Sequence, residues 1–471
     1  MKILHTSFEC YPIAKVGGLA DVVGALPRYQ NELENQSSVI MPYHDNSFTQ
    51  QHNFKVIYKG KLTLGSLVYE FSVRQLTSKD LGFDLYTIHT GRLLDRQNVY
   101  GYKDDTERFI VFQKAVLDWL QNIEEKPDII HCHDHHTGLI PFLMTHGEPY
   151  ESLRSIPTIL TIHNAQYQGQ ISYDKLHYLP SFDKNKIGLL DWSGCINPLA
   201  SAIKCAWKVT TVSPSYMKEL QVRANGLENL LSQEKNKSVG ILNGIDAEHW
   251  NPKTDSMLVK NYSFNNLITG RKANKKWLCE EYELDINRPL FAFIGRLVGE
   301  KGADILPEII TETINNTNAC VFMLGSGDPA VEKQLEELKK QFQGRYNAHI
   351  GYDEELSHKI YAGADFLLMP SRVEPCGLNQ MYALRYGTVP VVRRVGGLKD
   401  TVVDIGDNGF GICHDQVLVW DVCYSIKRAI NLYNDQEHYK KIQKKIMKID
   451  HSWNRSAQEY VDLYNSLIQL K

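Results

Sequence analysis

Two glycines beside a lysine mark the first place in the sequence that could bind an anion. The segment Lys15-Val16-Gly17-Gly18 lies between an apolar run and an amphipathic run, which predicts a strand, a turn and a helix start. Glycine lets a ligand approach the backbone closely, and the free N–H groups of a helix N-terminus attract negative charge. Lys15 adds a mobile positive charge. The same residues also fit an ordinary strand–helix turn, so the pattern alone leaves both interpretations open.

A pair of positive side chains forms the second candidate anion site. Arg296 lies two residues after an apolar run at 290–294. Lys301 comes five residues later, just before Gly302 and a predicted helix. Ligands of open α/β sheets bind at the carboxyl ends of strands, and an arginine fork with a lysine point charge suits a diphosphate. Surface arginines and lysines are common, so this pair alone is a weak signal.

A third segment, residues 369–380, also follows a predicted strand and opens a helix. Gly377, Leu378 and Asn379 fall in the first turn of that helix, which is another place where an anion can bind. Glu374 precedes the turn at the edge of the sheet. Its carboxylate can bind sugar hydroxyls or steady positive charge, and the alternative is a capping or ion-paired glutamate.

Four histidines lie together in His131-Cys132-His133-Asp134-His135-His136, where a predicted strand ends. Strand alternation would put His131, His133 and His135 on one side, which invites a metal. Only Asp134 adds an acidic ligand, so we favour a site without metal, in which strand-end Asp and His side chains line a cleft. His163 ends another strand, and the polar and aromatic residues at 164–169 suit sugar recognition. A structural histidine is the alternative there.

A glycine pattern at residues 325–330 imitates a dinucleotide fingerprint. Gly325-Ser326-Gly327-Asp328-Pro329-Ala330 fits Gly-x-Gly-x-x-Ala after a strand. It does not follow the first strand of a domain, Pro329 distorts the turn, and no strand ending in Asp or Glu follows at the expected spacing of about 20 residues. We therefore interpret it as a loop bordering a nucleotide site rather than a nicotinamide site.

Composition limits the remaining classes. The 471 residues predict two or three domains, and the net charge of −3 gives no sign of a nucleic-acid or anionic-membrane partner. No apolar run approaches the roughly 20 residues of a transmembrane helix. The 9 cysteines are scattered without a Cys-x-x-Cys pair, and the N-terminus has no signal core, so we expect reduced thiols and a cytoplasmic location.

The elements that must position these residues are those of an α/β protein. Short apolar runs alternate with longer amphipathic runs, as in parallel sheets wrapped by helices. The runs fall into two series: 2–7, 37–41, 129–132, 158–162 and 208–212, then 238–242, 290–294, 319–324, 366–369 and 389–392. Two series predict two doubly wound domains in tandem, with the switch near 243–255. Helical spacing of apolar residues predicts a closing helix over 452–470.

Taken together, these stretches resemble bacterial glycogen synthase and plant starch synthase over nearly the whole chain. The shared motifs run from Lys15-Val16-Gly17-Gly18-Leu19-Ala20-Asp21-Val22 to Ser452-Trp453-Asn454-Arg455-Ser456-Ala457. Between them lie Asp134-His135-His136-Thr137-Gly138-Leu139, His163-Asn164, Tyr167-Gln168-Gly169, Ile241-Leu242-Asn243-Gly244-Ile245-Asp246 and Glu374-Pro375-Cys376-Gly377-Leu378. Their order and spacing together make the resemblance specific.

The resemblance implies the GT-B fold, in which two Rossmann-like, doubly wound domains face a central cleft. Residues 1–242 would form an N-terminal domain on the acceptor side, of the starch synthase catalytic type. Residues 243–450 would bind the sugar nucleotide, and 451–471 would form a helix that packs back on the first domain.

It also implies a reaction. Glucose passes from a nucleotide donor, usually ADP-glucose in bacteria, to the non-reducing end of an α-1,4-glucan such as glycogen or a malto-oligosaccharide. The anomeric configuration is retained, and no metal or cofactor is needed. The oligomeric state and any allosteric control are not implied.

The roles of individual residues follow from the same likeness. Arg296 and Lys301 would neutralise the leaving diphosphate, while the Gly17-Gly18 loop closes on it from the other domain. The backbone carbonyl of His163 would support the developing positive charge, and Glu374 would orient the glucose. The expected catalytic residues are Asp134, His163 and Glu374, and the expected donor-binding residues are Lys15, Gly17, Gly18, Asn243, Arg296, Lys301, Tyr352, Gly377, Leu378 and Asn379. Asp134 and Asn243 would line the sugar pocket, and Tyr352 would pack on the base.

Three positions depart from the usual family pattern. His135 stands where Trp is common, Val373 replaces a Phe, and Asn379 replaces a Thr. All three leave the charged groups intact. Alternatives at this stage are a UDP-glucose-preferring synthase of the same fold and a non-catalytic glucan-binding protein. A nicotinamide-dependent oxidoreductase fails on the missing acidic ribose ligand.

Overall fold

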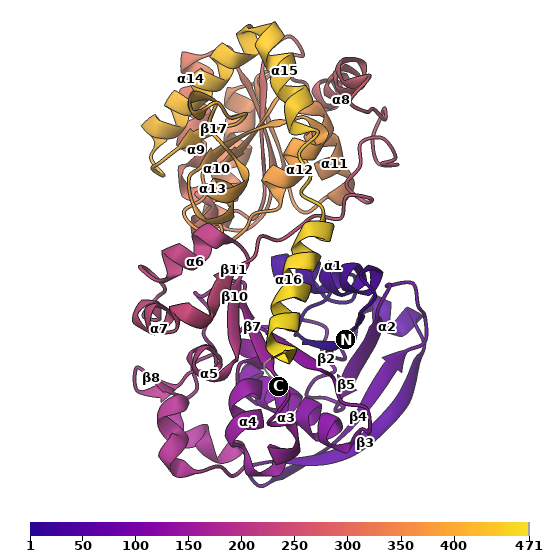
Figure 1. Ribbon diagram of the computed structural model, residues 1–471. Helices are drawn as coiled ribbons and strands as arrows, with labels where there is room; N and C mark the ends of the chain where they lie inside the picture. The colour runs from indigo at the N-terminus through magenta and orange to yellow at the C-terminus, as the bar shows by residue number, and fades with distance from the viewer. Residues whose placement is uncertain (470–471) are drawn as a thin grey trace. The chain divides into compact units, whose positions relative to one another are not determined.

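The computed structural model describes residues 1–469, and the chain divides into two compact units (Figure 1). Unit 1 comprises Met1–Asn243 together with the C-terminal segment from Trp453. Unit 2 comprises Gly244–Ser452. The expected ranges of 1–242, 243–450 and 451–471 differ from these bounds by one or two residues.

Unit 1 is built on a 9-stranded sheet in the order β11-β10-β7-β6-β1-β2-β5-β4-β3. Every pair is parallel from β11 to β5, whereas β4 is antiparallel to both β5 and β3. The strands are β1 (Lys2–Thr6), β2 (Gln36–Pro42), β3 (Phe54–Leu64), β4 (Leu67–Leu76), β5 (Asp84–His89), β6 (Ile129–His133), β7 (Thr158–Ile162), β10 (Lys208–Thr211) and β11 (Ser238–Gly240), with a separate pair β8 (Asp191–Trp192) and β9 (Cys195–Ile196).

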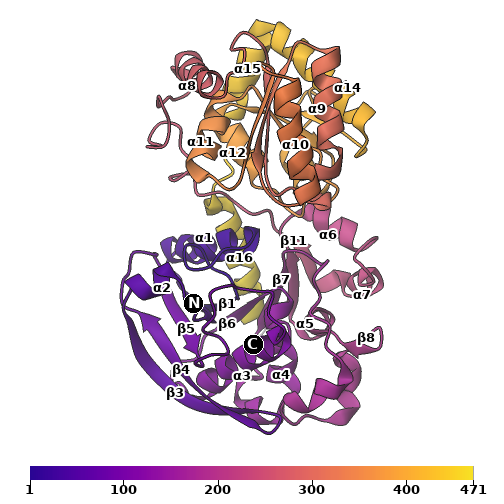
Figure 2. The same cartoon turned by 180° about the vertical axis from the view of Figure 1, so that it is seen from behind.

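The helices of unit 1 include the last helix of the chain. They are α1 (Gly18–Glu32), α2 (Ser47–Gln51), α3 (Asp105–Asn122), α4 (Ile140–His146), α5 (Pro198–Cys205), α6 (Pro214–Leu220), α7 (Glu228–Gln233) and α16 (Trp453–Ile468). Helix α16 lies beside α1 in both views (Figures 1 and 2), and the two helices are in contact. Its apolar stripe, including Trp453, Tyr460 and Tyr464, packs into the core with Val22 and Leu26 of α1.

Unit 2 contains a 6-stranded, fully parallel sheet in the order β14-β13-β12-β15-β16-β17. The strands are β12 (Leu290–Ile294), β13 (Cys320–Gly325), β14 (Tyr346–Ile350), β15 (Phe366–Met369), β16 (Val389–Arg393) and β17 (Ile412–His414). The strand order grows outward in both directions from β12 and β15, which is the doubly wound arrangement.

Helices cover both faces of this second sheet. They are α8 (Leu267–Glu281), α9 (Leu306–Asn316), α10 (Pro329–Gln341), α11 (Glu354–Gly363), α12 (Asn379–Tyr386), α13 (Gly396–Thr401), α14 (Val419–Asn434) and α15 (Gln436–Ile446). Strand alternation explains the two layers, because Phe291 packs with α9 and α14 whereas Leu290 packs with α8 and α11. Figure 2 shows α9 and α10 over one face.

The structure corrects the predicted series of strands in two ways. The run predicted over 238–242 is β11, and it belongs to the first sheet, where it pairs with β10, rather than to the second. No strand was predicted at β3, β4, β5, β8, β9, β14 or β17. The long hairpin β3–β4 is largely exposed at the sheet edge, so its residues alternate with polar ones and lack a buried apolar run.

Among residues 1–469, no helix is both long enough and apolar enough to cross a lipid bilayer. The predicted closing helix over 452–470 is α16, Trp453–Ile468, and its predicted last residue, Leu470, lies outside the described residues.

Candidate functional site

The candidate residues of unit 2 gather where the strand order of its sheet reverses. Strands β12 and β15 are neighbours, and the chain leaves them in opposite directions along the sheet. Arg296 follows β12, and Glu374 follows β15, so both lie at the carboxyl ends of these two strands. This is the position at which open α/β sheets bind their ligands.

Lys301 and Glu374 form a partly buried ion pair there. The Lys301 ammonium lies 2.6 Å from Oε1 and 2.7 Å from Oε2 of Glu374, and the Ser371 hydroxyl lies 3.0 Å from Oε2. The Glu374 side chain is only 7% exposed, and that of Lys301 is 24% exposed. The two residues predicted to hold opposite ends of a sugar nucleotide are therefore in direct contact with each other.

A glycine brings Lys301 to this position. The short 3-10 helix Gly299–Lys301 ends at Gly302, which has a φ of 72°. A Cβ on Gly302 would lie 2.4 Å from the carbonyl oxygen of Pro370, directly after β15. Only glycine fits both the left-handed conformation and this close approach, so Gly302 fixes the loop of β12 against the loop of β15.

Arg296 is the more accessible cation of the predicted pair. Its guanidinium lies 3.6 Å from the Glu300 carboxylate, and its side chain is 56% exposed. A contact of this length and exposure contributes little to stability, so Arg296 remains available to a ligand.

The turn before α12 presents a helix N-terminus to the same region. Gly377 has a φ of 72°, and Leu378 at the N-cap makes no side-chain cap hydrogen bond. The side chain of Asn379 donates to the carbonyl of Ile294 at 2.8 Å, so it ties α12 to the end of β12. Tyr352, in the loop between β14 and α11, is 79% exposed.

Unit 1 has its own reversal of strand order, between β1 and β6. Strand β1 pairs with β2 on one side and β6 on the other. The Lys15-Val16-Gly17-Gly18 loop follows β1, and Asp134 follows β6. The two candidate clusters of unit 1 therefore lie at the carboxyl ends of the strands where the strand order reverses. The Arg296 and Glu374 clusters have the same position in the sheet of unit 2.

The glycine loop already holds a carboxylate. The backbone N–H groups of Val16 and Gly17 donate to Oε2 of Glu9, at 2.6 and 3.0 Å, and the Tyr100 hydroxyl donates to Oε1 at 2.8 Å. Burial raises the pKa of Glu9, although these hydrogen bonds oppose the shift. The loop therefore binds an anion in this structure, as its sequence predicts, and the anion is a side chain of the same unit. Lys15 pairs with Asp21 at 2.7 Å.

Neither glycine of this loop is required by the fold. Gly17 is extended, with a φ of −146°, and neither Gly17 nor Gly18 has a positive φ. A Cβ on either residue would have no atom within 4 Å. The protein thus has room for a side chain at both positions but carries none. This is typical of a backbone that a ligand approaches closely.

Asp134 and His163 are joined across the ends of β6 and β7. The carboxylate Oδ1 of Asp134 accepts the backbone N–H of His163 at 2.7 Å. Asp134 has a φ of 56° and a ψ of −173°, a conformation that is costly for any residue but glycine. Burial raises the pKa of Asp134 to about 7. Backbone strain and a shifted pKa together are typical of a functional carboxylate.

Two further features of unit 1 suit a polar ligand. Oδ1 of Asn243 is buried and has no hydrogen-bond partner within residues 1–469. A pocket of about 370 Å³ opens beside the loop after β7, lined by His135, Gln166, Tyr167, Gln168, Gly169, Gln170 and Asn225. Amide groups with a half-exposed aromatic ring are suited to hydroxyl groups and to the face of a sugar ring.

The predicted row of histidines on β6 is wrong at one position. His131 and His133 lie on one side of β6, with ring centroids 4.3 Å apart. His135 does not continue the row, because β6 ends at His133 and the left-handed Asp134 turns the chain. Its ring lies against that of His136 instead, tilted by 37°, and His5 of β1 joins the row.

Two groups of side chains in the described residues have the composition of a metal site. His5, His131 and His133 form one, and His249, Glu354 and His358 form the other. Every ring nitrogen of the first group already has a hydrogen-bond partner. In the second group, His249 lies 3.5 Å from Glu354, whose hydrogen bond raises the pKa of that histidine, so we interpret this contact as an ion pair.

The glycine pattern at 325–330 does not form an anion site. The Asp328 carboxylate caps α10 by accepting the backbone N–H groups of Ala330 and Val331, at 2.8 and 3.4 Å. A helix N-terminus filled by its own carboxylate has no free donors for a pyrophosphate. This observation supports the rejection of a nicotinamide site.

Sequence reasoning missed the partners of the predicted residues. Glu9, Tyr100 and Ser371 each hold a group that the sequence analysis did consider. Glu9 had a signal, because an acidic residue at the end of the first strand is placed to meet the next helix N-terminus. Tyr100 and Ser371 are polar residues in loops, and no spacing in the sequence distinguishes them.

Two protein-family models match the chain, and they divide it as the units do. Residues 2–233 match "Starch synthase catalytic domain", and residues 261–446 match "Glycosyl transferases group 1". The first match contains the glycine loop, Asp134 and His163. The second contains Arg296, Lys301 and Glu374.

Curated and solved relatives cover the chain from end to end. The chain is 54% identical to a glycogen synthase of Flavobacterium johnsoniae, with 100% of each protein covered. It is 37% identical to a glycogen synthase of Acholeplasma laidlawii, covering 99% of each. The catalytic domain of starch synthase IV from Arabidopsis thaliana, solved bound to ADP and acarbose, superposes with a TM-score of 0.90 at 32% identity and 99% coverage of each chain. The chain therefore belongs to the glycogen synthase and starch synthase family and is a glucosyltransferase of the GT-B fold.

Proposed function

We propose that this enzyme transfers glucose from ADP-glucose to the non-reducing end of an α-1,4-glucan and retains the anomeric configuration. The observation that carries the proposal is the cluster at the strand reversal of unit 2. Arg296, Lys301 and the N-terminus of α12 offer positive charge there, beside the buried carboxylate of Glu374. Groups of both signs suit a reaction that separates charge.

In this reaction the bond between the anomeric carbon and the diphosphate oxygen breaks, and ADP leaves. A bond forms between that carbon and the hydroxyl oxygen of the acceptor, and the hydroxyl proton leaves with the diphosphate. Positive charge develops on the sugar while negative charge develops on the diphosphate. Fixed charges of the opposite sign lower the barrier because they need no reorganisation.

Lys301 can contact two negative groups at once, the Glu374 carboxylate and the diphosphate. An ammonium group has three N–H donors, and two of them point to the two oxygens of Glu374. The third is left for a phosphate oxygen. With Arg296 this gives two cations for one diphosphate, so we propose that transfer proceeds without a metal ion or cofactor. Glu374, held by Lys301 and Ser371, orients the glucose.

We assign the glucan acceptor, and further contacts to the glucosyl group, to residues of unit 1. His163 and Asp134 act at the glucosyl group, and the buried Oδ1 of Asn243 accepts a sugar hydroxyl. The pocket beside Tyr167 takes the glucan acceptor, either glycogen or a malto-oligosaccharide. His135, which stands where the family commonly has Trp, lines that pocket. In the proposal its ring contacts the glucan in place of the larger aromatic.

The proposal is tested by incubating the purified protein with glycogen and ADP-glucose in EDTA. We expect release of ADP and growth of α-1,4-linked chains, with the α configuration visible in the proton NMR spectrum of the product. Activity lost in EDTA and restored by a divalent ion would contradict the metal-free assignment. A higher kcat/KM with UDP-glucose would overturn the choice of donor, and glucan binding without release of either nucleotide would indicate a non-catalytic protein.

A further inference from the structure

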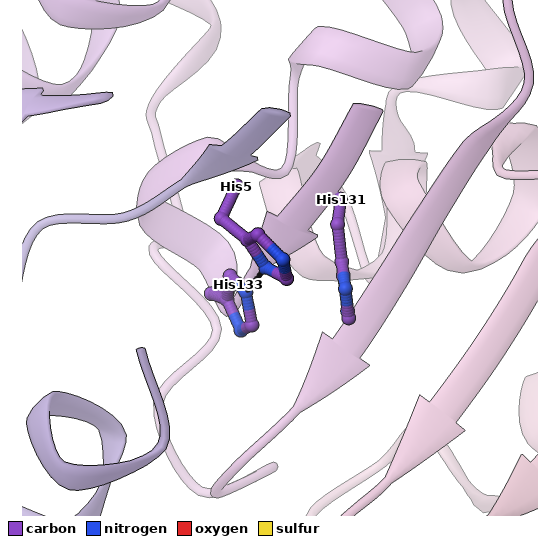
Figure 3. Close-up of side chains that lie close together, drawn as sticks. All are labelled: His5, His131 and His133. Carbon is purple, nitrogen blue, oxygen red and sulfur yellow. Dashed lines mark hydrogen bonds between the residues drawn. The ribbon is translucent and has the colours of Figure 1, made fainter. Parts of the chain in front are cut away.

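A row of buried histidines leads from the interior of unit 1 to the candidate catalytic residue His163. Figure 3 shows His5 of β1 with His131 and His133 of β6. All three rings are fully buried, and His163 at the end of β7 is nearly so. No step of the reaction described above uses the first three, so their presence in the core needs another explanation.

Hydrogen bonds join these rings in sequence. Nε2 of His163 lies 2.9 Å from Nδ1 of His133. The other nitrogen of His133, Nε2, lies 3.1 Å from Nδ1 of His5. Nε2 of His5 then lies 2.9 Å from the side-chain carbonyl oxygen of Gln30, on α1. His133 and His5 thus each make one contact of this chain with Nδ1 and the next with Nε2.

The last partner decides the direction of every bond. An amide oxygen only accepts, so the hydrogen must be on Nε2 of His5. A neutral imidazole carries one hydrogen, so Nδ1 of His5 accepts from Nε2 of His133. By the same reasoning, Nδ1 of His133 accepts from Nε2 of His163. Burial keeps the rings neutral, because it lowers the pKa of His5 to about 4, that of His163 to about 3, and that of His133 well below its usual value.

The other two partners of the Gln30 amide are hydroxyl groups, which suit this orientation of the amide. The hydroxyl of Ser37 lies 2.6 Å from its oxygen, and its nitrogen donates to the Tyr464 hydroxyl of α16 at 3.1 Å. Tyr464 lies 2.7 Å from Nδ1 of His131, and Nε2 of His131 lies 2.6 Å from the Thr161 hydroxyl. A phenol that accepts from the amide donates its own hydrogen to His131, so this second branch agrees with the first in direction.

A metal ion is the alternative explanation for three histidines at this distance. A ligating imidazole needs a free, unprotonated nitrogen aimed at the ion. Each of the six ring nitrogens of His5, His131 and His133 is already within hydrogen-bond distance of another side chain. Binding a metal would break several of these buried bonds at once, so the hydrogen-bonded chain is the better account.

We propose that Gln30, His5 and His133 are positioning residues that hold His163 as the Nε2–H tautomer and leave the lone pair of its Nδ1 for the bound sugar. The orientation of one amide on α1 is thereby transmitted through two rings to the site. The role of the Nδ1 lone pair towards the sugar rests on the proposed function. The assignment of the His163 tautomer does not depend on that function.

The tautomer is measured directly by NMR of protein labelled with ¹⁵N-histidine, in which the His163 signal is assigned by its loss in His163→Gln. We expect His5, His133 and His163 of the wild type to carry hydrogen on Nε2. An Nδ1–H tautomer at His163 of the wild type would overturn the proposal, whether or not any variant folds. Binding of added Co²⁺ that shifts the signals of His5, His131 and His133 would overturn it in favour of a metal site.

Variants at Gln30 test the transmission. Gln30→Met keeps the length of the side chain but removes the acceptor, so we expect a substantial population of His163 to move its hydrogen to Nδ1. Gln30→Glu keeps an acceptor oxygen, and Ser37→Ala removes only the second donor to that oxygen, so both should retain Nε2–H. An unchanged His163 tautomer in a folded Gln30→Met would contradict the relay.

Kinetics then separates positioning from a merely structural role. For Gln30→Met we expect kcat to fall by about tenfold while the donor KM stays within about twofold, because the ring is present but presents the wrong nitrogen. Ser37→Ala should keep both constants within about twofold. If the tautomer changes while kcat does not, His163 does not act through Nδ1. In that case the assignment of the sugar to His163 fails, and the relay itself stands.

Discussion

At the scale of single residues, the glycines at positions 17 and 18 indicate where a ligand contacts the backbone. Neither has a positive φ, and a Cβ on either would meet no atom within 4 Å. Glycine is a common N-cap residue, as at Gly17, but for Gly18 the fold gives no reason, and glycine in a helix costs up to about 1 kcal/mol relative to alanine. The remaining reason is a ligand that needs the space.

We predict that Gly18→Ala raises the KM for the sugar nucleotide by about tenfold, since one methyl group in a ligand contact costs roughly 1–3 kcal/mol. The free energy of unfolding should stay the same or rise slightly, because Gly18 is the first residue of α1. Initial rates and urea unfolding measure the two effects. Gly24→Ala is the matched control, since a Cβ there would lie 2.4 Å from the Tyr11 carbonyl oxygen and should reduce stability. A lower stability with an unchanged KM in Gly18→Ala would contradict the ligand interpretation.

The Lys301–Glu374 pair makes a simple alanine variant ambiguous. Lys301→Ala would leave a carboxylate that is 7% exposed without its cation. Breaking a buried ion pair costs about 3–5 kcal/mol, and partial exposure of Lys301 argues for the lower end. Loss of activity in that variant would therefore mix lost chemistry with lost structure.

We predict that Lys301→Met lowers the free energy of unfolding by about 3 kcal/mol and that Lys301→Met with Glu374→Gln recovers at least half of this loss. Neither protein should turn over the donor at a substantial rate. Chemical denaturation of the two single variants and the double variant completes the cycle. A loss in the double variant equal to the sum of the two single losses would show that the pair is not coupled. Lys339→Met, at a partly exposed lysine beside Glu336, is the control and should change stability little.

At the scale of elements, apolar runs sufficed for the buried parallel strands. Strands β7, β12 and β15 have the predicted bounds, because both of their faces are covered and their residues are almost all apolar, with two threonines in β7. The hairpin β3–β4 could not be found in this way, because its half-exposed residues alternate and two-residue turns occur everywhere. The carboxyl ends of the predicted strands placed Asp134, His163, Arg296 and Glu374 correctly at sheet edges. Which side chains pair there depends on strand order, which a single sequence does not contain.

Helix α16 is an element of unit 1 that arrives from the far end of the sequence. Trp453, Tyr460 and Tyr464 are buried against α1 and the first sheet, and Ser456 donates to the carbonyl of Leu242 at 2.6 Å. Replacing a large buried aromatic residue by alanine costs about 3–5 kcal/mol. The cost should fall on the unit that contains the cavity.

We predict that Trp453→Ala lowers the hydrogen-exchange protection of α1 and of β1 by about 3 kcal/mol, while β12 and β13 keep theirs. Mass spectrometry of exchanged peptides resolves the two units. Asn454→Ala, at the exposed neighbour in the same helix, should leave both units within about 0.5 kcal/mol of the wild type. Equal loss in both units would show that α16 does not belong to unit 1 alone.

At the scale of the whole molecule, the two units differ in how they carry histidine. Burial lowers the pKa of eight histidines of unit 1: His5, His44, His131, His133, His135, His136, His146 and His163. In unit 2 the pKa of His414 is lowered, whereas that of His249 is raised. Composition alone shows 17 histidines and nothing of this division, because burial is a property of the fold.

We predict that acid destabilises unit 1 first. Below pH 6.5 the unfolded chain binds more protons at these histidines than the folded unit does, so the stability of unit 1 falls as the pH drops. Asp134, Glu9 and Asp118 act in the opposite sense, because burial raises the folded pKa of each carboxyl, but they are three groups against eight. Hydrogen-exchange protection measured at pH 7.5 and 5.5 should fall more in β1, β6 and β7 than in β12, β13 and β15, after correction for intrinsic exchange.

His131→Gln replaces one buried ring by a group that does not titrate, so its difference in protection between the two pH values should be smaller than that of the wild type. Equal losses in the two units would show that the buried histidines of unit 1 take up protons while the unit is folded.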